Sequence, residues 1–110
     1  MFARVTLFEI DTLRIPIEDA ERLFDEQVVP LLEQQPGFEG LYVMRTPEGK
    51  GMVLSLWKSE KEAQSGIESG YYQAQIAKFV TFMRQPPGRE HYEVTRARLA
   101  PDAVALLQQR

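Results

Sequence analysis

The sequence predicts an α+β fold with the ferredoxin-like order β-α-β-β-α-β, in which an antiparallel sheet carries helices on one face. Extended alternating segments and amphipathic helical segments follow one another in that order along the chain. Two of the extended segments are joined by a short glycine-containing turn over residues 46–51, which is typical of an antiparallel hairpin. The 110 residues suit one domain, expected over residues 1–98 and followed by a tail helix over residues 99–110.

The first strand is expected over residues 2–10, where apolar side chains alternate and occur on both faces. Arg4 and Glu9 lie near its ends and are expected to emerge into solvent. One face carries Ala3, Val5 and Leu7, and the other carries Phe2, Thr6, Phe8 and Ile10. A strand that is apolar on both sides is expected in the middle of a sheet.

An amphipathic helix of about five turns is expected to begin near Ile17, because apolar residues recur there at steps of three and four. Pro30 lies inside this pattern and should kink the helix. The residues Gln35-Pro36-Gly37 should end it. Residues 41–45 and 52–57 then form the two strands of the predicted hairpin.

The second helix is expected to begin at Ser59, which forms a capping box with Glu62. Gly70 should divide this helix into a short polar part and a longer part that runs to Arg84. The longer part carries an apolar stripe of Tyr72, Ile76, Phe79, Val80 and Met83. A fourth strand is expected over residues 91–98. The tail helix would present Val104, Leu106 and Leu107.

A sheet covered by helices on one face leaves its other face in need of cover. That open face would include apolar residues from several strands, and a large apolar patch is unusual on a monomer. The sequence therefore predicts a homodimer that forms through the sheet faces.

The composition argues against several classes of function. The net charge is −3 with both signs interspersed, so no basic patch indicates nucleic-acid binding. The chain has no cysteine, which excludes disulfides, thiolate metal sites and a cysteine nucleophile. The scattered acids Glu9, Glu39 and Glu93 have no histidine partners at ligand spacing, so no metal site is expected. No signal peptide or membrane span is recognisable, and a cytoplasmic location is expected.

Two segments resemble the antibiotic biosynthesis monooxygenase superfamily. One combines Pro30-Leu31-Leu32 with Gln35-Pro36-Gly37-Phe38-Glu39-Gly40, and the other runs from Val53 to Ala63 through Trp57. The resemblance implies a dimeric α+β barrel in which two sheets face each other, with an apolar cavity between sheet and helices. Several members oxidise phenolic polycycles with oxygen and use no cofactor, others degrade haem, and many have no known reaction.

Haem-degrading members use an Asn on the first strand, a Trp at the end of the third strand and a His on the second helix. Only Trp57 matches this set, because the chain has no Asn and its single His, His91, belongs to the predicted fourth strand. Without a helix histidine to ligate iron, haem degradation is not expected.

Three aromatic residues and the histidine are candidate functional residues. Trp57 could stack on a flat ligand or donate its indole N–H, although a strand-end Trp also serves as a core plug. His91 has a normal pKa near neutrality and could deprotonate a phenol, unless it is a solvated surface histidine. Tyr71 and Tyr72 follow the break at Gly70 and could hydrogen-bond a substrate oxygen. Core packing for Tyr72 and a surface position for Tyr71 are the alternatives.

Phe8, Thr6 and Ser55 could complete the pocket wall from the central strands, or belong to an ordinary core. The leading hypothesis is a monooxygenase-like protein that acts without a cofactor on a small aromatic or phenolic substrate, with Trp57 and Tyr72 positioning it and His91 or a tyrosine assisting its deprotonation. One alternative is a non-catalytic small-ligand-binding or stress-related dimeric barrel. Another is an isomerase or lactone-handling enzyme on the same fold.

Overall fold

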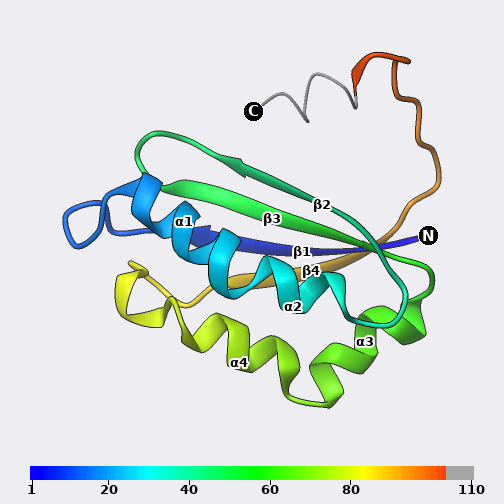
Figure 1. Ribbon diagram of the computed structural model, residues 1–110, viewed down its shortest axis with the longest axis horizontal. Helices are drawn as coiled ribbons and strands as arrows, with labels where there is room; N and C mark the ends of the chain where they lie inside the picture. The colour runs from blue at the N-terminus through cyan, green and yellow to red at the C-terminus, as the bar shows by residue number, and fades with distance from the viewer. Residues whose placement is uncertain (104–110) are drawn as a thin grey trace.

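The computed structural model describes residues 1–103 and shows one four-stranded sheet with helices on one face (Figure 1). In chain order the elements are β1 (Phe2–Glu9), α1 (Ile17–Gln27), α2 (Val29–Glu33), β2 (Phe38–Arg45), β3 (Lys50–Trp57), α3 (Glu60–Glu68), α4 (Tyr71–Ala77), a 3-10 turn (Val80–Phe82) and β4 (Gly88–Glu93). The expected α+β, ferredoxin-like order is confirmed. The apolar positions of the predicted tail helix, Val104, Leu106 and Leu107, lie outside the described residues.

The strand order is β2-β3-β1-β4, and every neighbouring pair is antiparallel. Because β1 lies between β3 and β4, Arg4 has Ser55 opposite it on one side and His91 on the other. Side chains alternate along a strand, so Thr6 and Phe8 lie on the same face as Arg4, toward the helices. The central position expected for the first strand is confirmed.

Both predicted helices are interrupted where the sequence indicates. The first is divided into α1 and α2 at Val28, where φ is −114°. Pro30 follows this break, and it has no amide hydrogen with which to continue the helical hydrogen bonds. The second is divided into α3 and α4 at Gly70, whose φ of +84° is left-handed and favours glycine. Ser59 caps α3 by accepting a hydrogen bond from the backbone amide of Glu62, as expected.

The fourth strand differs from the prediction of residues 91–98. β4 spans Gly88–Glu93, because its partner β1 sets its limits: Phe2, the first residue of β1, lies opposite Glu93. The last backbone bond along this edge runs from the Val94 amide to the Met1 carbonyl, at 2.9 Å. The residues after Val94 therefore have no remaining stretch of β1 to pair with.

The second helix also ends earlier than the predicted Arg84. α4 stops at Ala77, and the chain then turns back toward the end of β1. The Arg84 amide donates to the Glu9 carbonyl at 2.9 Å, and Met83 forms an isolated antiparallel bridge with Ile10. These long-range backbone bonds replace the last helical turns.

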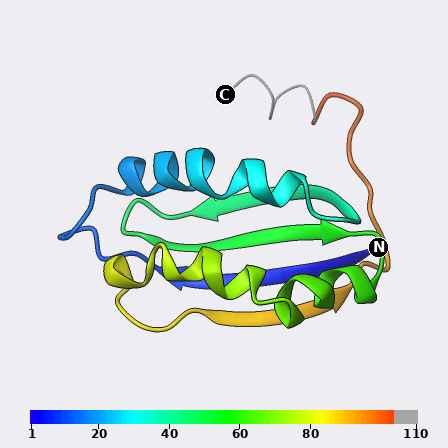
Figure 2. The same ribbon diagram turned by 60° about the horizontal axis from the view of Figure 1, so that its bottom comes forward.

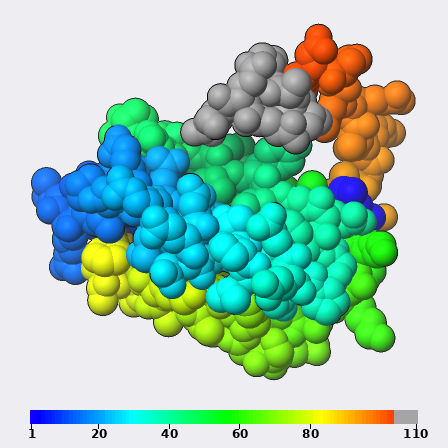
Figure 3. Space-filling view, in the orientation of Figure 1, coloured from blue at the N-terminus to red at the C-terminus, as the bar shows by residue number. Residues whose placement is uncertain are grey.

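The buried core is divided between the two ends of the sheet. One cluster contains Ile10, Ile17 and Ala20, with Phe8, Ile15 and Met83 packed against it. The other contains Leu32, Trp57 and Ala63, with Phe38, Leu41 and Tyr71 packed against it. Between them, the rings of Phe24 and Phe79 lie 6.3 Å apart and join α1 to the segment after α4. Figure 3 shows the resulting helix layer, with α1 and α2 in blue to cyan above α4 in yellow-green.

Among residues 1–103, the helices α1, α2, α3 and α4 all lie on one side of the sheet, and none of them covers its other face (Figure 2). Leu7, Met44 and Tyr92 lie on it and expose 36%, 47% and 51% of their surfaces. An open apolar face was the basis for expecting a dimer, and the structure shows that face. Within residues 1–103, no helix is long and apolar enough to cross a membrane.

Candidate functional site

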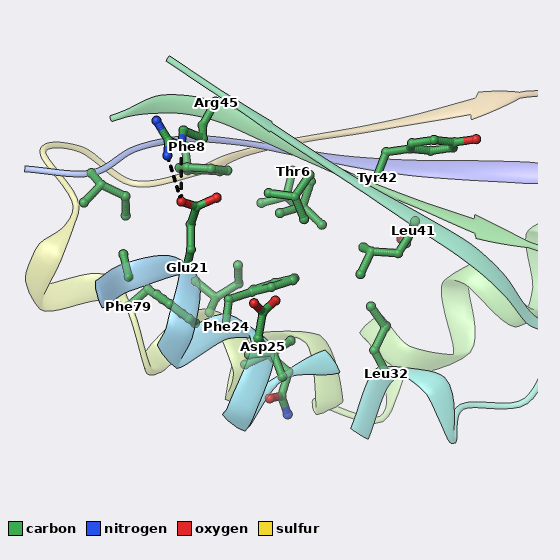
Figure 4. Close-up of a pocket in the computed structure, with 18 of the residues that line it drawn as sticks. Thr6, Phe8, Glu21, Phe24, Asp25, Leu32, Leu41, Tyr42, Arg45 and Phe79 are labelled. Atoms are coloured by element: carbon green, nitrogen blue, oxygen red, sulfur yellow. Dashed lines mark hydrogen bonds and ion pairs between the residues drawn. The ribbon is translucent and has the colours of Figure 1, made fainter. Parts of the chain in front are cut away.

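A cavity of about 590 Å³ lies between the sheet and the helix layer, in the space between the two core clusters. Its walls come from the strands β1, β2 and β3, the helices α1, α2 and α4, and the segment after α4, and most of the lining side chains are apolar. Figure 4 shows Phe8, Phe24 and Phe79 around one part of it and Leu32 and Leu41 at the other end. Sites for small molecules commonly have this size and this mainly apolar lining.

The cavity reaches solvent between α1 and the edge strand β2. Exposed Asp25 and half-buried Tyr42 belong to its wall there. Arg45 and Glu21 form an ion pair across the same opening, with 3.0 Å between Nη2 and Oε1 (Figure 4). Both side chains are about a third exposed, at 27% and 31%. The mouth is thus charged, whereas most of the interior is not.

The inner wall of the cavity carries two tyrosine hydroxyls at the start of α4. The Tyr72 hydroxyl lies 2.7 Å from Oγ1 of Thr6, and both residues are buried. The Tyr71 hydroxyl is buried and has no hydrogen-bond partner among residues 1–103. Burial raises the pKa of Tyr71, opposed by the nearby charge of Arg4. Tyr71 therefore remains protonated at neutral pH and offers a hydrogen-bond donor.

The guanidinium of Arg4 lies beside these tyrosines in the cavity wall. Only 4% of Arg4 is exposed, and its Nη1 donates to the Ala63 carbonyl at 3.0 Å. Its Cζ lies 4.8 Å from the ring centroid of Trp57 and 4.9 Å from that of Tyr72. Burial lowers the pKa of Arg4, but a guanidinium remains charged at any physiological pH. The inner end of the cavity is therefore polar and positive.

Five of the residues expected from the sequence line this cavity. They are Thr6, Phe8, Ser55, Tyr71 and Tyr72. The β1–β3 register places the strand residues on the helix-facing side, and the break at Gly70 directs α4 so that its first turn covers them.

Trp57 was expected in the pocket wall but is instead packed in the core behind it, with 1% of its surface exposed. The ring of Phe38 meets it edge-on at 5.8 Å, and its indole N–H donates to Ser55 Oγ at 2.9 Å. The Arg4 guanidinium lies over the Trp57 ring, so a ligand in the cavity does not reach that ring directly. The strand-end core plug is the arrangement that the structure shows.

His91 also lies outside the cavity wall, on β4 beside Arg4. Its Nδ1 is 3.2 Å from Nε2 of Gln64, and its Nε2 is buried without a partner among residues 1–103. Burial lowers the pKa of His91, and the charges of Arg89 and Arg4 lower it further. The imidazole is therefore neutral at pH 7, but it is not placed to reach a ligand in this cavity.

Arg4 is the site residue that the sequence analysis missed, since its place near a strand end suggested solvent exposure. The alternation of β1 contains the missing signal. Arg4 precedes Thr6 and Phe8 by two and four residues and therefore shares their inward face. When a charged residue shares a strand face with apolar residues, that shared face predicts that the charge is buried. This is a better guide than the nearness of the residue to the end of the strand.

Comparisons with known proteins agree with this architecture. A family model described as antibiotic biosynthesis monooxygenase matches residues 5–78. A search of curated proteins finds no match. Among solved structures, the chain is similar to a monooxygenase from the gene ActVA-Orf6 of Streptomyces coelicolor, in complex with the ligand nanaomycin D. The identity is 19%, over 90% of this chain and 91% of that chain, with a TM-score of 0.68.

Two further solved structures share the fold. SnoaB from Streptomyces nogalater, a cofactor-independent oxygenase, is 12% identical over 87% of this chain and 94% of its own, with a TM-score of 0.70. The heme-degrader MhuD from Mycobacterium tuberculosis, with two hemes bound in its active site, is 17% identical over 88% of this chain and 98% of its own, with a TM-score of 0.69.

Proposed function

The chain belongs to the antibiotic biosynthesis monooxygenase family, and from this premise we propose that it binds a small aromatic or phenolic molecule in its cavity and oxidises it with molecular oxygen, without a cofactor. The main support for this proposal is the cavity itself, which has apolar walls and has hydroxyl groups at its inner end. Apolar walls suit the body of an aromatic ligand, and the hydroxyls suit one oxygen substituent. SnoaB, described as a cofactor-independent oxygenase, provides a precedent on this fold.

The proposed chemistry begins with a phenol that is deprotonated in the cavity. The phenolate gives one electron to O₂, and the two radicals combine to form a carbon–oxygen bond. The resulting peroxide takes up a proton and then loses water. The phenol thereby gives up its O–H hydrogen and the hydrogen of the attacked carbon and gains a second C=O, while the other oxygen atom of O₂ leaves as H₂O. Oxygen accepts all four electrons that the substrate loses, and no other reductant is needed. The water-poor apolar walls protect the reactive intermediates from side reactions.

Tyr72 and Tyr71 are the residues that would position the phenolic oxygen. Thr6 fixes the Tyr72 hydroxyl, while the Tyr71 hydroxyl is free to donate to a ligand. His91 takes no direct part in this scheme because it does not line the cavity. The phenol's proton therefore leaves to solvent rather than to His91, and the positive charge of Arg4 in the cavity wall stabilises the phenolate that remains.

Haem does not fit the residues of this cavity. Histidine and cysteine are the common protein ligands of haem iron in enzymes, and neither lines it. Among residues 1–103 no cluster of histidine, cysteine and acidic side chains is placed to hold a metal ion. The proposed reaction therefore has no step through haem.

Oxygen consumption with a panel of anthrones, quinols and catechols tests the proposed reaction. Wild type is expected to consume oxygen with at least one compound, and Tyr72→Phe to do so at least about tenfold more slowly, because it loses a hydrogen bond to the reacting oxygen. His91→Ala is the matched control and should retain activity. If wild type leaves oxygen untouched with every compound, the monooxygenase proposal fails.

A non-catalytic ligand-binding protein is the second candidate. It is favoured by one observation: the only histidine of the chain, His91, lies outside the cavity wall, so the wall has no imidazole to act as a general base. Saturable binding of these compounds without oxygen uptake would support this role.

We also propose that two copies of the chain pair through their open sheet faces. The apolar residues exposed there, Leu7, Met44 and Tyr92, would be buried by such a contact.

A further inference from the structure

We propose that the cavity holds its ligand as an anion, with a carboxylate or phenolate oxygen bound by the Arg4 guanidinium and the Tyr71 hydroxyl. The ligand class is then an apolar aromatic acid, of which an acidic phenol is one form. This inference rests on the proposed function for the site and narrows its substrate. It is independent of whether the bound molecule is oxidised.

The first observation is that Arg4 is a buried cation without a carboxylate partner among residues 1–103. The ion pairs of residues 1–103 use Arg14, Arg22, Arg45 and Arg84. Arg4 forms none of them, although it is more deeply buried than any of these. A buried charge is costly unless an opposite charge or several hydrogen bonds accompany it.

The internal contacts of Arg4 satisfy it only in part. A guanidinium has five N–H donors, and within residues 1–103 the Arg4 side chain makes one hydrogen bond, to the Ala63 carbonyl. The rings of Trp57 and Tyr72 supply the remaining stabilisation through cation–π contacts. The acids of the cavity wall, Glu21 and Asp25, lie at the mouth, where Glu21 is already paired. Among the described residues, most N–H groups of the Arg4 guanidinium therefore have no acceptor, and they are available to a ligand at the inner end of the cavity.

A second, independent observation points to the same place. The Tyr71 hydroxyl is buried without a partner among the described residues, although a buried hydroxyl ordinarily has one. Gly66 of α3 shows that Tyr71 and Arg4 are neighbours. A Cβ added to Gly66 would lie 3.5 Å from Arg4 Nη1 and 3.7 Å from the Tyr71 ring. Arg4 and Tyr71 thus lie at the same end of the cavity, where the acid group of one ligand would meet both.

The surrounding charge favours an ionised ligand. Arg89 lies 5.3 Å from the Tyr72 ring centroid, so two cations flank that ring. A nearby positive charge lowers the pKa of an acid. A phenol bound beside Arg4 would lose its proton to solvent more readily than in water. This explains how the reaction proposed above can proceed although His91, the one histidine of the chain, lies outside the cavity wall.

The test compares matched ligands by isothermal titration calorimetry on the full chain. The pair 2-naphthoate and 2-naphthamide has the same aromatic body and differs in charge. Wild type is expected to bind the carboxylate at least about tenfold more tightly, as hydrogen bonds to a charged group are worth more than neutral ones. No preference for the carboxylate, or no binding of either compound, would overturn the proposal.

Three variants test whether Arg4 and Tyr71 cause the preference for the carboxylate over the amide. Arg4→Gln should abolish it, and Arg4→Lys should restore part of it. Tyr71→Phe should weaken naphthoate binding about three- to tenfold and leave naphthamide unchanged. If Arg4→Gln does not fold, as judged by circular dichroism, Tyr71→Phe and the wild-type ligand pair still decide the outcome. A preference that survives unchanged in both folded Arg4→Gln and Tyr71→Phe would refute the assignment.

A chromophoric phenol separates the two acid classes. Binding of 4-nitrophenol at a pH below its solution pKa should bring out the visible absorbance of the phenolate. If it does, an ionised phenol is bound, as the monooxygenase scheme requires. If naphthoate is preferred but the phenolate band stays absent, the anion site is supported with carboxylic acids as its ligands. The proposed oxidation of a phenol is then refuted. Failure of oxygen uptake alone would not affect the binding result.

Discussion

The Thr6–Tyr72 hydrogen bond and the Arg4 guanidinium decide the polarity of the inner cavity. Thr6 and Tyr72 come from β1 and α4, 66 positions apart, and their oxygens lie 2.7 Å from each other. This bond holds the first turn of α4 over the sheet and keeps the Tyr72 ring against Arg4. A ligand therefore meets groups whose positions are already fixed.

Thr6→Val is expected to destabilise the protein by about 1–3 kcal/mol, because valine keeps the shape of threonine but leaves the buried Tyr72 hydroxyl unpaired. Urea unfolding measures this loss. Tyr72→Phe removes the other partner, and the double variant should be less destabilised than the sum of the two single variants. An additive double variant would mean that the two hydroxyls do not interact.

His91 is expected to make stability depend on pH. Its pKa is lowered in the folded state by burial and by Arg89 and Arg4, while Glu60 acts weakly the other way. As the pH falls below about 6.5, the unfolded chain takes up the proton first, so folding becomes less favourable. The effect is absent above that pH, where both states are neutral.

His91→Gln removes this titration while keeping a polar side chain beside Gln64. Relative to wild type, the variant should gain stability between pH 7.5 and pH 5.5, measured as urea midpoints. Effects of pH on all other groups are common to both proteins and cancel in the comparison. An equal difference between the two proteins at both pH values would contradict the lowered pKa.

The elements of the fold differ in how far their own residues determine them. The hairpin, the Ser59 N-cap and the helix breaks just before Pro30 and at Gly70 follow from local chemistry, and the structure contains all of them. The limits of β4 and the early end of α4 depend on pairing with β1, which is distant in sequence. Local patterns do not contain that information, and those two predictions were wrong.

Gly70→Ala is expected to cost about 1–2 kcal/mol, because alanine is strained at a φ of +84°. Among residues 1–103, no atom lies within 4 Å of the position that its Cβ would take, so the cost would come from the backbone alone. Gly88→Ala is the matched control. Gly88 has no positive φ and only ordinary contacts at 3.7 Å, so this change should be nearly neutral in thermal unfolding. Equal losses in both variants would argue against a left-handed Gly70.

At the scale of the whole molecule, the sequence predicts the fold and the open sheet face, but not the shape of the cavity. Whether facing apolar side chains close into a core or leave space depends on their combined volume in three dimensions. For Phe8, Tyr72 and Trp57, the sequence pattern is equally compatible with a place in the packed core and with a place in the cavity wall. Only the first two line the cavity, because Arg4 and Phe38 enclose Trp57.

The dimer proposal predicts a mass of about twice 12.7 kDa by light scattering at micromolar concentration. Leu7→Glu, on the open face, should shift the protein toward a monomer, because two carboxylates would be buried at the interface. Leu13→Glu is the matched control, since Leu13 is 90% exposed and lies in the loop between β1 and α1. A wild-type mass near 12.7 kDa would contradict pairing through the sheets.

The ion pair at the mouth bears on how fast an acid enters the cavity. Glu21 and Asp25 give the opening a net negative charge even with Arg45 present, whereas Arg4 gives the inner end of the cavity a positive charge. An acidic ligand is thus repelled at the entrance and attracted beyond it. Added salt screens the exposed mouth more than the buried end. Stopped-flow traces should therefore show naphthoate associating faster at higher ionic strength, the reverse of ordinary electrostatic steering.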